Sequence, residues 1–192
     1  PEADAWMPIV HVGNAGMCRQ DSIEVDELSH PLHVKYRRLL ADTEGAGTYR
    51  GAPSIEVEFG PSEDNSFRVL YVADGTINPA AGTRGGLSGG PIQIFKRSDK
   101  GDITPQAAYG DVELLPGETI ISISSGGGGY GPPTAREVGW VKQDLDEGWI
   151  TRERAETVYG LTLDAAGVVD MAATDARRRQ IQAVASGGSD QR

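Results

Sequence analysis

Apolar and polar residues alternate along several short segments in the first part of the chain. The clearest is Ile-Glu-Val-Glu-Phe, in which Ile55, Val57 and Phe59 fall on one face of an extended strand. Other runs of strand length are rich in β-branched and aromatic residues; they are residues 32–40, 67–73, 92–95 and 119–124. No helical period separates these runs, so parallel βαβ units are not expected. The pattern predicts antiparallel β structure, a sandwich or barrel-like layer, over residues 32–124.

The spacing of apolar residues becomes helical after Pro133. Thr134 and Glu137 have the spacing of a capping box, and Val138, Val141 and Leu145 then form one apolar stripe that ends before a glycine. A short helix, a small hairpin and a further helix are predicted beyond it, at residues 151–159, 161–169 and 174–185. The C-terminal segment is therefore expected to be mainly helical.

These patterns together predict an α+β protein. Glycine marks the division, because 18 of the 26 glycines lie between Gly45 and Gly131, where they separate short apolar runs. We expect a β-rich, glycine-punctuated region over residues 1–131 and a helical segment packed on it over residues 132–185. The polar residues 186–192 are predicted to form a flexible tail.

Charge and composition limit the function. The 192 residues include 18 Lys and Arg against 28 Asp and Glu, a formal net charge of -10. Nucleic acid and anionic membranes are therefore not expected as partners, since both attract clustered basic residues. No apolar run reaches the length of a membrane helix and no signal-peptide pattern is present, so a cytoplasmic location is predicted. Cys18 is the only cysteine, which excludes an intrachain disulfide and a thiolate metal cluster.

The run Gly126-Gly-Gly-Gly-Tyr-Gly131 matches the G-x-G-x-x-G fingerprint of dinucleotide-binding folds. However, two prolines separate its last glycine from the predicted helix, and no parallel strand with a terminal acid follows. A run of four glycines instead indicates a close approach to another backbone or to a ligand.

The segment Gly86-Leu-Ser-Gly-Gly90 matches the G-x-S-x-G nucleophile elbow. The elbow requires a helix after the serine, whereas a proline and a strand-like run follow here. All three histidines also precede Ser88, the reverse of the order in that fold. We therefore interpret the segment as a glycine-rich turn.

The three histidines do not form a convincing metal set. In His30-Pro-Leu-His33, the proline and the following strand place the two rings on opposite faces. His11 lies near three acidic residues, Asp21, Glu24 and Asp26, but acidic loops are usually only solvated. A Walker sequence is also absent, so no ATP site is predicted on this chain.

A series of motifs in the same order resembles the hydantoinase B family. Downstream the series comprises Ser125-Gly-Gly-Gly-Gly-Tyr-Gly-Pro-Pro133, Arg136-Glu-Val, Val141-x-x-Asp144-x-x-x-Gly148-x-Ile-Thr151 and Ala155-x-x-x-Tyr-Gly160. Upstream it comprises His11-Val-Gly-Asn14, Ser22-Ile-Glu24, Pro31-Leu, Gly45-Ala-Gly-Thr-Tyr-Arg-Gly51 and Gly86-Leu-Ser-Gly-Gly90. The resemblance extends over about residues 8–185. The sequence departs from the family pattern at Pro132, where an aspartate is common, and at His30, where an aromatic residue is common.

The resemblance implies a role in a multi-subunit, ATP-dependent enzyme. In such systems an A-type partner phosphorylates a carbonyl-derived oxygen, and the B-type part completes a hydrolysis or a carboxylation. Family members run to several hundred residues, so the chain resembles either a separately encoded C-terminal subunit or a processed piece of a B subunit. ATP and a divalent metal are accordingly expected on partner subunits, namely the larger A-type and B-type chains.

The resemblance also supplies candidate site residues, although none is assigned a catalytic role. Asn14 and Glu24 are candidates for polar groups near the interface with the rest of the B subunit. Arg50 is a candidate for pairing with a carboxylate or phosphate, with a structural ion pair as the alternative. The loop residues are candidates for lining the shared site with their N–H groups: Gly126, Gly127, Gly128, Gly129, Tyr130 and Gly131.

Three functional hypotheses follow from the sequence. The first is a subunit of a hydantoinase-like or oxoprolinase-like cyclic-amide hydrolase, with a ketone carboxylase as the alternative reaction. The second, of another class, is a noncatalytic β-sandwich binding or scaffold module. The third is a self-contained small hydrolase, which the order of the serine and the histidines and the poor metal set disfavour.

Overall fold

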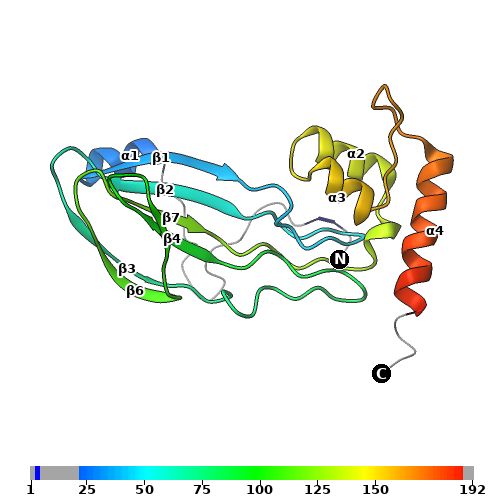
Figure 1. The fold of residues 1–192 in the computed structure, drawn as a ribbon, viewed down its shortest axis with the longest axis horizontal. Coiled ribbons are helices and arrows are strands. Elements are labelled where there is room, and N and C mark those ends of the chain that lie inside the picture. Colours follow the sequence, from blue (N-terminus) through cyan, green and yellow to red (C-terminus); the bar gives the residue numbers. More distant parts are fainter. Residues whose placement is uncertain (1–2, 5–21, 188–192) are drawn as a thin grey trace.

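The described part of the chain forms two antiparallel β-sheets at one end and a group of helices at the other (Figure 1). The computed structural model describes residues 3–4 and 22–187. The strands are β1 (Leu32–Leu39), β2 (Ile55–Pro61), β3 (Phe67–Val72), β4 (Gln93–Arg97), β5 (Ile103–Pro105), β6 (Tyr109–Leu114) and β7 (Thr119–Ile123). The helices are α1 (Ile23–Ser29), the 3₁₀ turn η1 (Pro133–Ala135), α2 (Val138–Asp146), α3 (Arg152–Thr157) and α4 (Met171–Gly187).

The strands form a five-stranded sheet, ordered β1-β2-β7-β4-β5, and a two-stranded ribbon of β3 and β6. All strand pairs are antiparallel. Side chains from both layers make the core between them; the buried ones are Ala73, Ile94, Leu114 and Ile120, with Phe59, Phe67 and Val69 among those packed against them. The predicted α+β class with an antiparallel β layer is therefore confirmed.

The alternation in β2 has an unexpected consequence. Phe59 faces the core, as its position in the pattern predicts, but the glutamates between the apolar residues are the more deeply buried side chains. Glu56 and Glu58 are covered by long basic side chains on the same face of the sheet, those of Lys35, Arg38 and Arg97. The outer face of this sheet is thus an ion-pair layer.

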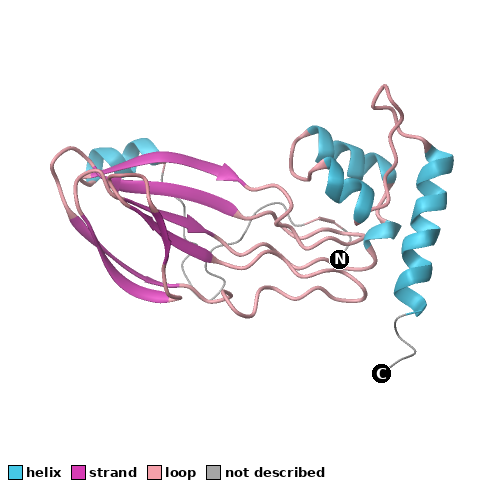
Figure 2. Cartoon of the chain, viewed as in Figure 1, coloured by secondary structure: helices cyan, strands magenta, loops and turns pink. Residues whose placement is uncertain are grey.

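Extended segments without regular secondary structure connect the sheets to the helices (Figure 2). We call residues 43–52, 80–90 and 126–131 the glycine bundle. Its backbone hydrogen bonds recur every third residue: Gly126 and Gly129 donate to the carbonyls of Gly90 and Leu87, whereas Gly127 and Tyr130 donate to those of Ala52 and Tyr49. Three residues per turn is the period of polyproline II, and a β ladder has a period of two.

The glycine bundle explains the run of four glycines. A Cβ atom added to Gly126 would lie 1.9 Å from the carbonyl oxygen of Thr43, and one added to Gly51 would lie 1.9 Å from that of Gly127. At each of the four glycines 126–129, an added Cβ atom would lie within 2.8 Å of a backbone atom of residues 43–52 or 80–90, so the backbones approach too closely there for a side chain. The predicted close approach to another backbone is confirmed.

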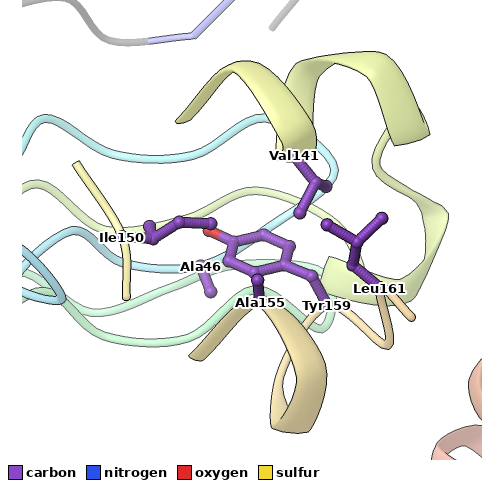
Figure 3. Close-up of a cluster of buried hydrophobic side chains, with 6 residues drawn as sticks. All are labelled: Ala46, Val141, Ile150, Ala155, Tyr159 and Leu161. Atoms are coloured by element: carbon purple, nitrogen blue, oxygen red, sulfur yellow. The ribbon is translucent and has the colours of Figure 1, made fainter. Parts of the chain in front are cut away.

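The helical end has its own apolar core (Figure 3). Tyr159 lies at its centre, and the other buried members are Ala46, Val141, Ile150, Ala155 and Leu161. Ala46 belongs to the glycine bundle, so this core joins the helices to the extended segments. Helix α4 contacts η1 through a hydrogen bond from Gln182 to the Thr134 hydroxyl.

The predicted capping box is wrong. Thr134 lies in the 3₁₀ turn, and Arg136 is extended, with φ -65° and ψ 138°. Helix α2 therefore begins at Val138, and the Glu137 carboxylate caps it by accepting from the N–H groups of Gly139 and Trp140. Because the Arg136 backbone is extended, Arg136 lies before α2 and is not part of the helix.

Other predicted elements agree with the structure within a few residues. Thr151 caps α3, and Leu163 bridges Val169 in the predicted hairpin. Helix α4 extends to Gly187, and residues 188–192 of the predicted tail lie outside the described part. Helix α1, strand β5 and strand β6 were not predicted as separate elements. No helix in the described ranges combines the length and apolar character that crossing a bilayer needs.

Candidate functional site

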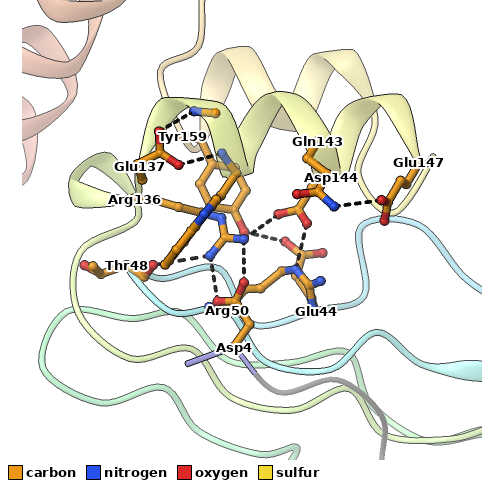
Figure 4. A network of polar contacts seen from close by, with 12 residues as sticks. Asp4, Glu44, Thr48, Arg50, Arg136, Glu137, Gln143, Asp144, Glu147 and Tyr159 are labelled. Atoms are coloured by element: carbon orange, nitrogen blue, oxygen red, sulfur yellow. Dashed lines mark hydrogen bonds and ion pairs between the residues drawn. The ribbon is translucent and has the colours of Figure 1, made fainter. Parts of the chain in front are cut away.

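A cluster of buried charges lies where the glycine bundle meets α2 (Figure 4). Asp144 on α2 accepts from Arg50 Nε at 3.0 Å and from an Arg136 terminal nitrogen at 2.9 Å. Arg136 also binds the Asp4 carboxylate through two hydrogen bonds of 2.7 Å, and the Arg50 N–H donates to the same carboxylate at 2.9 Å. Two arginines and two aspartates from distant parts of the sequence are thereby joined.

Burial makes this cluster energetically important. Arg50, Arg136 and Asp144 are all buried, and only Asp4 is partly exposed. A buried charge without a partner costs several kcal/mol, so about 3–5 kcal/mol is expected for breaking such a pair from one side. The structural ion pair that was the alternative for Arg50 is therefore present.

A pocket of about 370 Å³ opens beside the cluster. Its lining combines the charged residues with two tryptophans and two polar side chains: Asp4, Arg50, Arg136, Trp140, Gln143, Asp144, Glu147 and Trp149. The guanidinium of Arg50 lies 4.4 Å from the centre of the Trp149 ring, and that of Arg136 lies 5.4 Å from that of Trp140. These contacts hold the arginines in place and give the pocket aromatic walls.

A second buried acid lies nearby. Glu44 accepts from Arg154 Nε at 2.7 Å and from the Tyr159 hydroxyl at 3.0 Å, both through Oε1. Its Oε2 is buried and has no hydrogen-bond partner. Burial raises the pKa of the Glu44 carboxyl, and it also raises the pKa of Tyr159, whose hydroxyl donates to this carboxylate.

The predicted site residues are not all brought together. Arg50 and residues 126–131 share the glycine bundle, whereas Glu24 lies on α1 beside the sheets, at the other end of the molecule (Figure 1). The local hydrogen bonds of Glu24, first with its own backbone and then with Ser22, lower the pKa of its carboxyl. Asn14 and His11 lie outside the described residues.

Five of the six N–H groups of residues 126–131 have backbone partners. Those of Gly126, Gly127, Gly129, Tyr130 and Gly131 donate to backbone carbonyls of neighbouring segments. A role for them in lining a substrate site stays a prediction, and it would require these bonds to be replaced. Ser88 lies in the same bundle and is followed by strand β4, as expected for a turn and not for a nucleophile elbow.

The histidine motif spans the end of α1 and the start of β1. His33 Nδ1 lies 2.9 Å from Glu27 Oε1 on the surface of the β end. Within residues 3–4 and 22–187, no three His, Cys, Asp or Glu side chains are arranged to hold a metal ion. The residues of this region therefore do not fit a resident metal.

Sequence reasoning did not assign roles to Asp4, Arg136, Trp140, Asp144 or Trp149. One signal was present, because Asp144 lies three residues after Val141 on the apolar side of α2. A charged residue in an apolar helical stripe indicates a buried partner. No local pattern connects it to Asp4 or Arg50.

In the described part of the chain, an antiparallel β region is thus joined to a helical end by the glycine bundle, with the buried charge cluster at their junction. The family model described as hydantoinase B/oxoprolinase matches residues 1–133. The chain belongs to this family.

Individual relatives agree with this assignment. The chain is 29% identical over 179 residues to caprolactamase subunit beta of Pseudomonas jessenii, covering 91% of this chain and 31% of that one. It is 26% identical to the acetone carboxylase alpha subunit of Xanthobacter autotrophicus, covering 83% of this chain and 25% of that one. The crystal structure of ATP-dependent caprolactamase from Pseudomonas jessenii superposes with a TM-score of 0.69 and 26% identity, covering 82% of this chain and 28% of that chain. The chain thus spans less than a third of these relatives.

Proposed function

We propose that this chain is a small or processed part of the B-type subunit of an ATP-dependent, hydantoinase-like or oxoprolinase-like cyclic-amide hydrolase. The observation that carries the proposal is its similarity to caprolactamase subunit beta over 91% of its own length but only 31% of the relative's. A stretch that corresponds to under a third of such a subunit is expected to act together with the remainder.

The proposed chemistry is divided among subunits. A larger A-type partner phosphorylates the amide oxygen, which converts a poor electrophile into one with a phosphate leaving group, and the B-type part completes the hydrolysis. ATP and the divalent metal are proposed to bind to the partner subunits, in the cytoplasm.

One exposed surface supports association with a larger polypeptide. Leu70 and Val72 on β3 and Tyr109 on β6 are 76%, 80% and 75% exposed. Val72 and Tyr109 are direct cross-strand partners, so the three side chains share the outer face of the ribbon. We call these three residues the ribbon face. A contiguous apolar patch of this kind is typical of a protein interface.

The alternative reaction is the carboxylation of a ketone such as acetone or acetophenone. It is favoured by the similarity to the acetone carboxylase alpha subunit over 83% of the chain. An alternative of another class is a noncatalytic β-sandwich binding or scaffold module. Such a module would need only the two β-sheets.

Reconstitution tests the proposal. The chain is co-expressed with the A-type and B-type polypeptides of its own source, and native mass spectrometry measures whether they assemble. We expect a heteromeric complex that hydrolyses ATP in the presence of a lactam or hydantoin and without bicarbonate. A strict requirement for a ketone and bicarbonate would support the carboxylase alternative instead. A chain that stays monomeric in the presence of both partners would contradict both reactions and leave the scaffold module.

A further inference from the structure

We propose that Arg136 and the backbone N–H of Arg50 form a binding site for small carboxylate ligands, which the Asp4 side chain fills in cis. The inference rests on the contacts and charges of the buried cluster and does not depend on the proposed reaction. It assigns a ligand site to a cluster whose ion pairs also stabilise the fold.

The geometry is that of carboxylate recognition. The two terminal nitrogens of Arg136 each donate to a different oxygen of Asp4 at 2.7 Å, and the Arg50 N–H donates to one of them at 2.9 Å. This paired arrangement matches the fork of a guanidinium to the two oxygens of a carboxylate, and lysine cannot reproduce it. The Nε of Arg136 is also buried and has no hydrogen-bond partner.

A carboxylate is the natural partner of the Arg136 guanidinium at this position. Arg50 and Arg136 carry two positive charges, and Asp144 supplies one negative charge between them. Among the described residues, Asp4 supplies the second. Because the Arg136 guanidinium is buried, removing the Asp4 carboxylate takes away the acceptor of two of its hydrogen bonds in a poorly solvated place. Such a place attracts any carboxylate small enough to enter.

The Asp4 side chain is more exposed to solvent than the Asp144 side chain. The Asp4 side chain is 18% exposed, whereas the Arg136 side chain is 1% exposed, so the Asp4 carboxylate lies at the outer side of the cluster. The pocket of about 370 Å³ adjoins it, with Trp140 and Trp149 in its wall. A ligand with one carboxylate and a short carbon chain therefore fits where Asp4 lies and extends along the tryptophans.

The test removes the internal occupant and offers a free one. Acetate is titrated into the full chain and into Asp4→Ala, with binding measured by calorimetry and by tryptophan fluorescence. We expect acetate to bind Asp4→Ala at least about tenfold more tightly than wild type, because Asp4 no longer competes for the site. The melting temperature of the variant is expected to fall and then to recover with acetate in a saturable way.

A control variant and control solutes distinguish a specific carboxylate site from a general effect of salt. Asp64→Ala removes an exposed aspartate of the β end and is expected to bind acetate no better than wild type. Acetamide and chloride at matched ionic strength are expected to fail, because neither is a carboxylate. Asp4→Asn keeps the position filled with an uncharged amide, so acetate affinity is expected to lie between those of wild type and Asp4→Ala.

Two results would overturn the inference. The first is acetate binding to Asp4→Ala that is no tighter than to wild type or to Asp64→Ala. The second is equal recovery of the melting temperature by acetamide. If Arg136→Lys in the Asp4→Ala background folds by circular dichroism, undiminished acetate affinity in that double variant would also contradict the site.

Discussion

The β end and the helical end each contain a deeply buried glutamate, and the pKa values of these two carboxyls are shifted in opposite directions. Glu58 on β2 is 2% exposed and Glu44 in the glycine bundle is 1% exposed. Burial by itself raises the pKa of the Glu58 carboxyl, but hydrogen bonds from Arg97, Thr119, Tyr36 and Lys35 outweigh it and lower this pKa to about 2. At Glu44, burial outweighs the contributions of Arg154 and Tyr159, and the pKa is raised.

The two glutamates differ in how many hydrogen-bond donors reach each carboxylate oxygen. Arg97 donates to both carboxylate oxygens of Glu58, and the Thr119 hydroxyl and Lys35 add further hydrogen bonds. Arg154 Nε and the Tyr159 hydroxyl both donate to Oε1 of Glu44, and Oε2 has no hydrogen-bond partner. Both carboxylates are nearly inaccessible to solvent, but hydrogen bonds to the charged form outweigh desolvation at Glu58, whereas the stronger desolvation of Glu44 outweighs its hydrogen bonds.

The largest effect is expected at the helical end, from Asp144→Asn. The change leaves two buried guanidinium groups facing fewer negative charges, and we expect a loss of about 3–5 kcal/mol in the free energy of unfolding. Urea denaturation measures it. The matched control is Asp146→Asn on the same helix, whose exposed pair with Lys142 is expected to contribute less than about 1 kcal/mol. Similar losses in the two variants would contradict the buried cluster.

The glycine bundle, which joins the two ends, is tested by Gly126→Ala. The added methyl group would lie 1.9 Å from the Thr43 carbonyl oxygen, so the backbone must shift. We expect a loss of about 1–3 kcal/mol in the free energy of unfolding. Gly139→Ala in α2 is the control, since its nearest contact is the flexible Glu137 carboxylate, and a change below about 1 kcal/mol is expected. A tolerated Gly126→Ala would show that the segments are not closely packed.

The opposite pKa shifts of Glu58 and Glu44 predict opposite dependences of stability on pH. The folded pKa of Glu58, about 2, is below its ordinary 4.5, so its stabilisation is present above pH 4.5 and lost as the pH falls through about 2. The folded pKa of Glu44 is above 4.5, so its contribution is present below pH 4.5 and lost as the pH rises through the raised value.

Urea denaturation of wild type, Glu58→Gln and Glu44→Gln across acidic to neutral pH measures both contributions. The stability difference between wild type and Glu58→Gln is expected to shrink toward low pH. The difference between wild type and Glu44→Gln is expected to change in the opposite direction. Parallel pH profiles for the two variants would contradict the comparison.

The smallest effect on stability is expected at the ribbon face. Leu70→Ser changes an exposed side chain, so the free energy of unfolding should change by less than about 0.5 kcal/mol. We expect it nevertheless to weaken assembly in the reconstituted complex. Leu28→Ser on α1 is the matched control, since Leu28 is 88% exposed outside the ribbon. Unchanged assembly with Leu70→Ser, or an equal loss with Leu28→Ser, would contradict the ribbon face as the docking surface.

Local patterns in the sequence determined most of the individual elements. The alternation in β2, the β-branched runs of β3 and β7 and the Thr151 cap of α3 each depend on neighbouring residues, and all were predicted. Strand β6 was missed because Gly110 and two acidic residues interrupt its apolar pattern. The start of α2 was misplaced because Thr134 and Glu137 have capping-box spacing, whereas Arg136 between them is extended to reach the buried cluster. The ordered glycine and Pro-Leu motifs also sufficed to identify the family.

Only the tertiary structure decided what the glycines and the charges do. The three-residue hydrogen-bond period of the glycine bundle is a property of several segments packed together, and it cannot be read from any one of them. Similarly, Asp4 contacts residues 46 and 132 positions away, and Arg50 contacts one 94 positions away. A charged side chain looks the same in a sequence whether it is solvated or buried. Its role is set by which opposite charge the fold brings within hydrogen-bond distance, because desolvation makes that partner indispensable.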